Sequence, residues 1–128
     1  MTQQKKISTG LRATFLIHLI IGGIFGLIYL LIPDLFGSWI GWPVKEMTLY
    51  RVLGAAILGY AFSSYLAYRE TAWENVRIVV LAEIAWTILG AIAMAYGMIV
   101  LALPAVGWAF VVVLGAFAVA FIAFYSPK

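Results

Sequence analysis

Long apolar runs separated by short polar or proline-containing breaks dominate this chain. The runs fall at about residues 12–32, 44–68, 72–98 and 105–125. A helix of about 20 apolar residues crosses a hydrocarbon layer of about 30 Å. Because backbone polar groups in lipid must be paired within their own segment, the pattern predicts an all-α fold. We expect an integral membrane bundle of four transmembrane helices in up-down-up-down order, forming a single membrane domain over residues 1–128.

Shorter patterns predict how these helices begin and pack. In the first helix His18, Gly22 and Gly26 are spaced four apart and share one face, where small residues permit close contact between helices. The second helix has a stripe of mostly small residues with the same spacing, and we expect this stripe to be its packing face: Arg51, Ala55, Gly59, Ser63 and Ala67. Pro43 suits its first turn. Thr71 and Glu74 match a capping box that would begin the third helix.

Composition supports a membrane setting. Of the 128 residues, 66% are hydrophobic and 10% are charged, whereas soluble domains contain about 25% charged residues. Cysteine is absent, which excludes a disulfide framework and a thiolate metal site. The predicted partners are therefore the lipid bilayer and either a second copy of the chain or a larger membrane complex, with no nucleic acid.

The basic residues predict the orientation in the membrane. One side of the predicted bundle carries most of them: Lys5, Lys6, Arg12, Arg69, Arg77 and Lys128. The other side carries Lys45 and Arg51. Because cytoplasmic loops of membrane proteins are enriched in lysine and arginine, we expect a multi-pass protein of the plasma membrane with both termini in the cytoplasm.

A single carboxylate, Glu83, falls inside the apolar part of the third helix. A charge there costs on the order of 2.5–3.5 kcal/mol and indicates a functional site by default. At 1.5 Å per residue from the predicted cytoplasmic surface, Glu83 and His18 both lie about 9 Å deep. We therefore expect them to pair within one polar layer and to share a proton. The rest of this layer comes from the second and third helices: Tyr60, Ser63, Ser64, Trp86 and Thr87.

A second polar pair is predicted near the opposite surface. Asp34 follows the end of the first helix, and Arg51 lies about one turn inside the second. An ion pair between them would fix the hairpin that these two helices form.

The motifs for several chemistries are missing from the sequence. There is no glycine-rich phosphate loop, nucleophile elbow or His-Glu-x-x-His pattern. One histidine cannot supply both axial ligands of a haem within a monomer, and a zinc site needs more ligands than one layer provides. We expect no catalytic residue, cofactor or metal, and hence no enzyme.

The stretch IYLLIPDLFGSWIGWP, followed by LYRVLGAAILGYAFSSYLAYR, resembles small four-span membrane proteins of the DoxX-like kind. In those proteins a helix that ends at a proline precedes an arginine and a glycine-rich second helix. Pro33, Arg51, Gly54 and Gly59 stand in these places, and the resemblance covers about half the chain. DoxX-like proteins are associated with quinol-oxidase complexes, so the resemblance implies an accessory subunit.

Three functions are consistent with these features. The first is a non-enzymatic accessory or self-associating subunit whose polar layer is structural. The second is a proton-coupled carrier or channel for a small solute, with Glu83 as the exchange site and His18 adjusting its protonation. The third is a binding module for a quinone or another lipophilic ligand, using Glu83, Tyr60 and Trp86.

Overall fold

The computed structural model describes residues 4–125, which form five helices and no β-strand. The helices are α1 (Thr9–Leu31), α2 (Pro33–Ile40), α3 (Met47–Arg69), α4 (Trp73–Val100) and α5 (Gly107–Ala123). The all-α class is therefore confirmed. Lys128, one of the residues used to predict orientation, lies outside the described residues.

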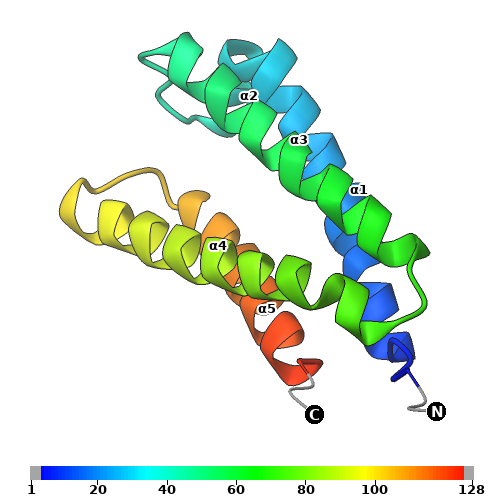
Figure 1. The fold of residues 1–128 in the computed structure, drawn as a ribbon. Coiled ribbons are helices and arrows are strands. Elements are labelled where there is room, and N and C mark those ends of the chain that lie inside the picture. The colour runs from blue at the N-terminus through cyan, green and yellow to red at the C-terminus, as the bar shows by residue number, and fades with distance from the viewer. Residues whose placement is uncertain (1–3, 126–128) are drawn as a thin grey trace.

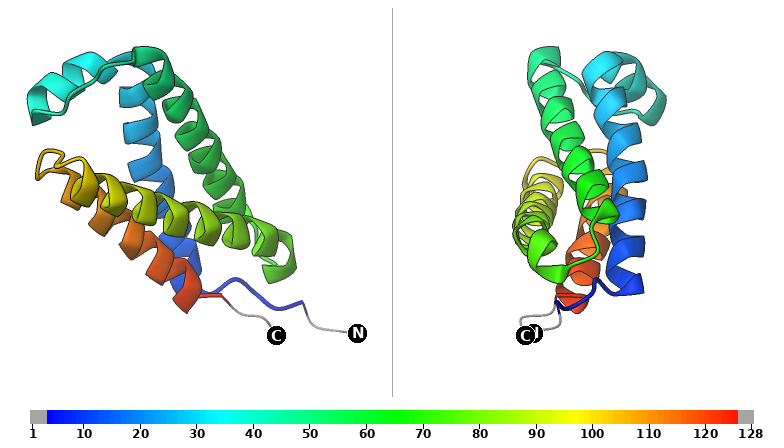
Figure 2. Two further views of the ribbon diagram at one scale, coloured as in Figure 1. Left: turned by 90° about the vertical axis from the view of Figure 1, so that its left-hand side faces the viewer. Right: turned by 45° about the vertical axis from the view of Figure 1, so that its right-hand side comes forward.

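The long helices pack as two hairpins. In Figure 1, α1 and α3 lie side by side with α2 at their far end, while α4 and α5 form the second hairpin. The hairpins meet near the end that carries both termini and diverge from there (Figure 2). Packing of all four helices along their whole length, as in a regular bundle, is not confirmed.

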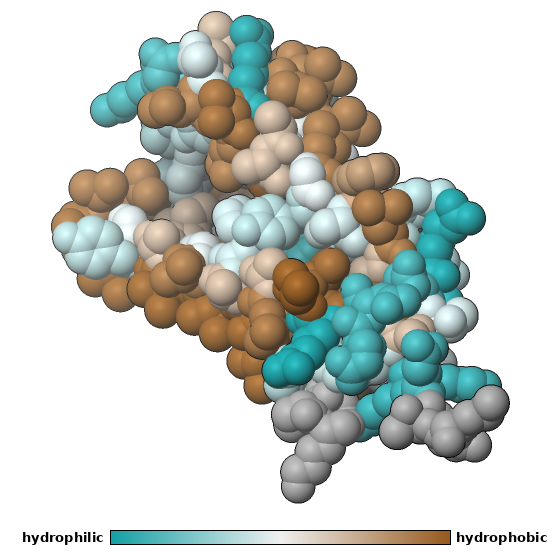
Figure 3. All heavy atoms as spheres, in the orientation of Figure 1, coloured by the Kyte–Doolittle hydropathy of each residue, from teal (hydrophilic) through white to brown (hydrophobic). Residues whose placement is uncertain are grey.

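Two of the helices, α1 and α4, are long and apolar enough to cross a membrane. A third, α5, is apolar but has only 17 residues. Large apolar side chains are exposed on α4 and α5, with Ile78 80% and Val112 68% exposed. The space-filling view shows apolar side chains along the lower edge of this hairpin, and hydrophilic residues at both ends of the molecule, most of them near the termini (Figure 3).

The α1–α3 hairpin depends on glycines at its crossing. Gly22 and Gly26 are buried against α3, as their spacing predicts, and Gly26 faces Leu58. On α3, a Cβ added to Gly54 would lie 2.6 Å from the backbone nitrogen of Leu30 and 2.8 Å from the carbonyl oxygen of Gly26. Only glycine fits this contact without moving a backbone.

The predicted packing face of α3 is wrong by a small rotation. The buried positions are Gly54, Ala61, Ser64 and Ala67. Of the predicted stripe only Ala67 is buried, while Arg51, Ala55 and Gly59 are exposed. The crossing needs the glycine that meets α1 backbone, so Gly54 sets the register and the spaced small residues do not.

Two helix starts also differ from the sequence prediction. The helix after Pro43 begins only at Met47, because Glu46 is its N-cap: the Thr48 amide donates to Glu46 Oε1 at 2.8 Å. This hydrogen bond lowers the pKa of Glu46. The connection between helices α1 and α3 is itself helical and contains α2.

The capping box at Thr71 and Glu74 does not form. The N-cap of α4 is Ala72, with no side-chain hydrogen bond. Instead the N-terminal segment satisfies the backbone: the Trp73 amide donates to the Lys5 carbonyl (2.7 Å) and the Ile7 amide donates to the Thr71 carbonyl (3.0 Å). A contact from a segment distant in sequence replaces the local cap.

Arg12 closes the same end of the molecule. Its guanidinium donates to the carbonyls of Tyr68 and Glu70, both at 2.8 Å. These carbonyls belong to the C-terminal turn of α3, where unpaired acceptors need donors and a positive charge is favourable. The ends of α1, α3 and α4 are thus tied together near the termini.

Candidate functional site

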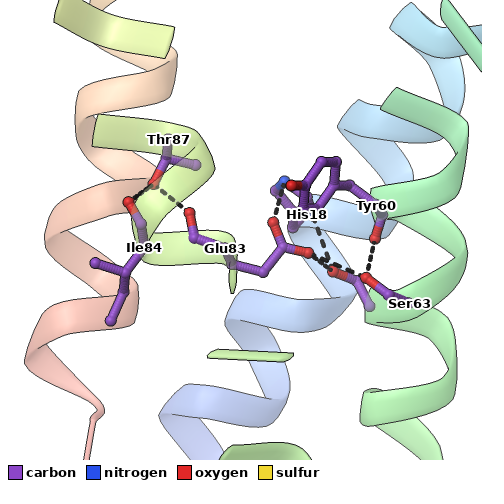
Figure 4. Close-up of polar contacts among 7 residues, drawn as sticks. His18, Tyr60, Ser63, Glu83, Ile84 and Thr87 are labelled. Carbon is purple, nitrogen blue, oxygen red and sulfur yellow. Dashed lines mark hydrogen bonds and ion pairs between the residues drawn. The ribbon is translucent and has the colours of Figure 1, made fainter. Parts of the chain in front are cut away.

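A polar cluster lies where the two hairpins meet. His18 comes from α1, Ser63 and Ser64 from α3, and Glu83 from α4 (Figure 4). The side chains of Ser64 and Glu83 are fully buried, and His18 is 5% exposed. The sequence-based pairing of Glu83 with His18 is therefore present in the structure, together with both serines.

Three members of the polar cluster form a closed ring of contacts. Ser64 Oγ donates to Glu83 Oε1 at 3.0 Å, and His18 Nδ1 lies 2.9 Å from Ser64 Oγ. On the other side of the ring, His18 Nε2 lies 3.4 Å from Glu83 Oε2. Glu83 Oε2 has no hydrogen bond within residues 4–125. This longest contact is the least satisfied part of the ring.

The ring geometry constrains where its protons are. A serine hydroxyl has one proton, and Ser64 gives it to Glu83, so His18 Nδ1 must carry a proton and donate to Ser64. If Glu83 were ionised and His18 neutral, two lone pairs would face each other in a buried site. A single proton between Nε2 and Oε2 removes this conflict. The ring therefore accommodates one shared proton and no net charge.

Ser63 has a secondary place in the polar cluster. Its hydroxyl donates to the Tyr60 carbonyl at 2.8 Å, a local bond common for serine in helices, and lies 3.4 Å from Glu83 Oε1. Because the hydroxyl has only one proton to donate, the shorter hydrogen bond to the Tyr60 carbonyl is favoured over the longer one to Glu83. Ser64 is the main donor to the carboxyl group.

The other residues of the predicted layer lie nearby without touching the carboxyl group through polar atoms. Thr87 is fully buried, but its hydroxyl donates to the backbone carbonyl of Glu83 (2.7 Å) and approaches that of Ile84 (3.3 Å). The rings of Tyr60 and Trp86 stack, with centroids 5.2 Å apart and planes 13° apart. This stack joins α3 to α4 beside the polar cluster.

The predicted outer pair does not form. Both Asp34 and Arg51 are exposed, and the ion pairs among the described residues do not include them. Asp34 lies in the first turn of α2, after Pro33 at its start, where the positive end of the helix dipole favours a carboxylate. The unexpected helix α2 thus gives Asp34 a role without Arg51.

An apolar core separates the polar cluster from the end with the termini. On each of the four long helices its residues lie between the cluster and that end: Leu11 and Phe15 on α1, Ala67 on α3, Val76 and Val80 on α4, and Phe121 on α5. The His18 ring packs edge-on against Phe117 and Phe121, with centroids 4.8 and 5.6 Å away. On this side of His18, one turn along α1, the buried Thr14 donates its hydroxyl to the Gly10 carbonyl at 2.9 Å and does not extend the cluster.

On the opposite side of His18 lies a cavity of about 450 Å³ between the diverging hairpins, here called the interhairpin cleft. All four long helices line it, and nearly all its side chains are apolar, with Phe25, Ile57, Met94 and Phe110 as examples. Its polar groups are few: His18, Tyr29 and Trp86. Sequence reasoning missed the cleft, because its existence depends on the angle between the hairpins.

Among residues 4–125 no group of three or more histidine or acidic side chains is close enough to hold a metal ion. No family model, curated protein or solved structure matches this chain. The resemblance to DoxX-like proteins stays a prediction, and function must be argued from the polar cluster and the interhairpin cleft.

Proposed function

We propose that this chain is a non-enzymatic membrane protein that binds a lipophilic small molecule in the interhairpin cleft. The observation that carries the proposal is the cleft itself. Sites for small molecules enclose about 300–1,000 Å³, have mainly hydrophobic and aromatic walls, and contain a few polar groups. A cavity of 450 Å³ with His18, Tyr29 and Trp86 among apolar side chains has these properties.

The size of the interhairpin cleft favours a small molecule over an inserted helix. A helix about 10 Å across with a pitch of 5.4 Å occupies roughly 420 Å³ per turn. The cleft therefore accommodates about one turn, whereas a membrane-spanning helix has five or more. A ligand or the end of a lipid chain matches the volume.

The setting that we propose is a plasma-membrane protein of four spans, α1, α3, α4 and α5, with both termini in the cytoplasm. The hydropathy of α1 and α4 supports it, as do the exposed apolar surface of α5 and the basic residues near the termini. Burial of Glu83 at a helix junction also fits a membrane bundle, where ionisable groups face the interior.

Extraction of the purified protein tests the proposal. Mass spectrometry of the organic extract is expected to show a lipophilic molecule in stoichiometric amount. Ala93→Phe adds a ring to the wall of the interhairpin cleft and should remove the molecule, whereas Ala85→Phe, on an exposed part of α4 outside the cleft, should retain it. Equal amounts in both variants would refute cleft binding.

A second candidate function is a self-associating or accessory subunit, and one observation favours it. A Cβ added to Gly59 meets nothing within 4 Å, and Ala55 is exposed beside it. Small residues on an uncovered helix face permit close packing in a membrane. Gly59→Leu should then abolish a cross-linked dimer in native membranes, and a dimer that persists in this variant would exclude the Gly59 face as the interface.

A further inference from the structure

The polar cluster and the interhairpin cleft have one residue in common. His18 lines the cleft, while its ring nitrogens contact Ser64 and Glu83, which do not line it. Ser64 and Glu83 have no exposed surface. Any exchange of the shared proton through the cleft must therefore pass the His18 ring.

The other partly exposed group that contacts Glu83 is Ser63, and it is a poor relay because its hydroxyl donates to the Tyr60 carbonyl at 2.8 Å and lies farther, 3.4 Å, from Glu83 Oε1. The helices packed around Glu83 contribute His18 from α1, Ser63 and Ser64 from α3, and only aromatic rings from α5. Thr87, on α4 itself, uses its hydroxyl on the backbone. Toward the termini lies the apolar core formed around Phe15, Val80 and Phe121, and the buried Thr14 beside it uses its hydroxyl on the Gly10 carbonyl at 2.9 Å.

We infer that the shared proton of His18 and Glu83 exchanges with water only through the interhairpin cleft, so that an uncharged lipophile in the cleft traps it. The site then couples occupancy by an apolar molecule to proton exchange at a buried carboxyl group. This inference rests on the proposed function for its ligand. Its route for the proton follows from the ring, the core and the position of His18.

Neutral ligands suit this arrangement best. The ring engages both nitrogens of His18, so a charged headgroup in the interhairpin cleft would find mainly apolar walls and would lose its hydration without a partner. An uncharged molecule loses little on entering. It also excludes water from the exposed edge of His18, which is the step that stops exchange.

The single histidine of the chain makes the exchange measurable. In full-length protein labelled with ¹⁵N-histidine and placed in lipid nanodiscs, NMR reports both ring nitrogens of His18 and the rate at which the ring N–H exchanges with water. Ala93→Phe and Ile57→Phe each fill the interhairpin cleft from a different helix. Ala85→Phe is the matched control outside the cleft.

The expected result is exchange slowed about tenfold or more in both cleft variants and unchanged in the control, because local opening to water governs such rates. Saturating delipidated wild-type protein with n-dodecane as the probe should slow exchange in the same way. If both filled variants exchange as fast as the wild type, the proton uses another route and the inference is wrong. If they slow exchange while no lipophile is extracted from the wild type, the route stands and the ligand function falls.

Discussion

At the residue scale, the carboxyl group of Glu83 can be fully buried because three neighbouring side chains contact its two oxygens. Ser64 satisfies one oxygen, His18 faces the other, and Ser63 approaches the first from farther away. Polar groups in a low-dielectric interior are stabilised only when such partners are complete. One shared proton completes the ring, and its loss leaves two acceptors facing each other.

The shared proton leads to a prediction for Glu83. In Glu83→Gln, the amide oxygen can still accept from Ser64 and the amide nitrogen can donate to His18 Nε2, as a protonated carboxyl group would. We expect this variant to unfold in detergent with nearly the wild-type free energy. Glu83→Ala leaves His18 Nε2 and the hydroxyl proton of Ser64 without partners and should lose about 3 kcal/mol or more.

Equilibrium unfolding of the two Glu83 variants in mixed micelles compares them directly. A glutamine variant as unstable as the alanine variant would mean that the site requires a carboxylate anion, which contradicts the neutral ring. A difference of several kcal/mol in favour of glutamine supports one shared proton.

The two neighbouring serines provide a second prediction. Ser64→Ala removes the main donor to Glu83 and the acceptor of His18, so the free energy of unfolding should fall by about 1–3 kcal/mol. Ser63→Ala mainly removes a local bond to the Tyr60 carbonyl and should cost less than about 0.5 kcal/mol. Equilibrium unfolding in mixed micelles compares the two serine variants. Equal losses of unfolding free energy would show that both hydroxyls stabilise the carboxyl group.

Much of this cluster could be predicted from sequence because helix geometry fixes depth. The constant rise per residue places Glu83, His18 and Ser64 at similar depths once the spans are known. Which atoms Thr87 and Tyr60 use could not be predicted in this way. Side chains of serine and threonine can bond to their own backbone, and only the packed rotamers show that Thr87 does so.

At the element scale, the α1–α3 contact is set by one close approach of two backbones. Gly54 meets the backbone of Gly26 and Leu30, and Gly59 faces open space one turn further along α3. The regular spacing of small residues on α3 includes Gly59 but not Gly54, so the prediction made from this spacing named the wrong packing face of α3. The distinction depends on how the two helices cross, which no local pattern contains.

These two glycines form a matched pair for a third prediction. Gly54→Ala forces α1 and α3 apart and should destabilise the protein by about 1–3 kcal/mol, as overpacking does. A Cβ at Gly59 meets no atom within 4 Å. Gly59→Ala should therefore be neutral or stabilising by up to about 1 kcal/mol, because the unfolded chain has less conformational entropy to lose with alanine than with glycine. Thermal unfolding in detergent measures both, and a destabilising Gly59→Ala combined with a neutral Gly54→Ala would contradict the crossing.

The start of α4 shows the same limit of local patterns. Thr71 and Glu74 have the spacing of a capping box, yet the backbone of Lys5–Ile7 pairs with residues 71–73 instead. The antiparallel bridge between Lys6 and Ala72 keeps Ala72 extended, and the Lys5 carbonyl supplies the acceptor for the Trp73 amide. The sequence separation of this contact, together with the Arg12 bonds to the end of α3, puts it beyond prediction from neighbouring residues.

At the scale of the whole molecule, the two hairpins pack closely near the termini and enclose the interhairpin cleft further along, where they diverge. Most contacts that join them lie toward the termini, in the polar cluster, the apolar core and the tied N-terminal segment (Figure 2). At the far end of the cleft the hairpins touch again through aromatic rings, where Phe110 of α5 packs against Phe25 of α1 and against Trp42, with centroids 5.7 and 6.3 Å apart. Hydropathy predicts the helices but not this divergence, because lipid and apolar side chains are equivalent neighbours for an apolar helix face. The position of the cleft is therefore set by the polar cluster, whose hydrogen bonds hold the hairpins together on the other side of His18.

The proposed orientation of the whole molecule gives the last prediction. Because the natural chain has no cysteine, single cysteines can report which side of the membrane a residue faces. Ser38 on α2 and Glu74 at the start of α4 are both exposed and lie at opposite ends of the molecule. In intact cells a membrane-impermeant maleimide should label Ser38→Cys at once and Glu74→Cys only after permeabilisation, since positive charge near the termini favours the cytoplasm.

The reverse pattern would invert the orientation and place the open side of the interhairpin cleft toward the cytoplasm. Labelling of both variants in intact cells would contradict an odd number of membrane crossings between α2 and α4, and with it the four-span arrangement.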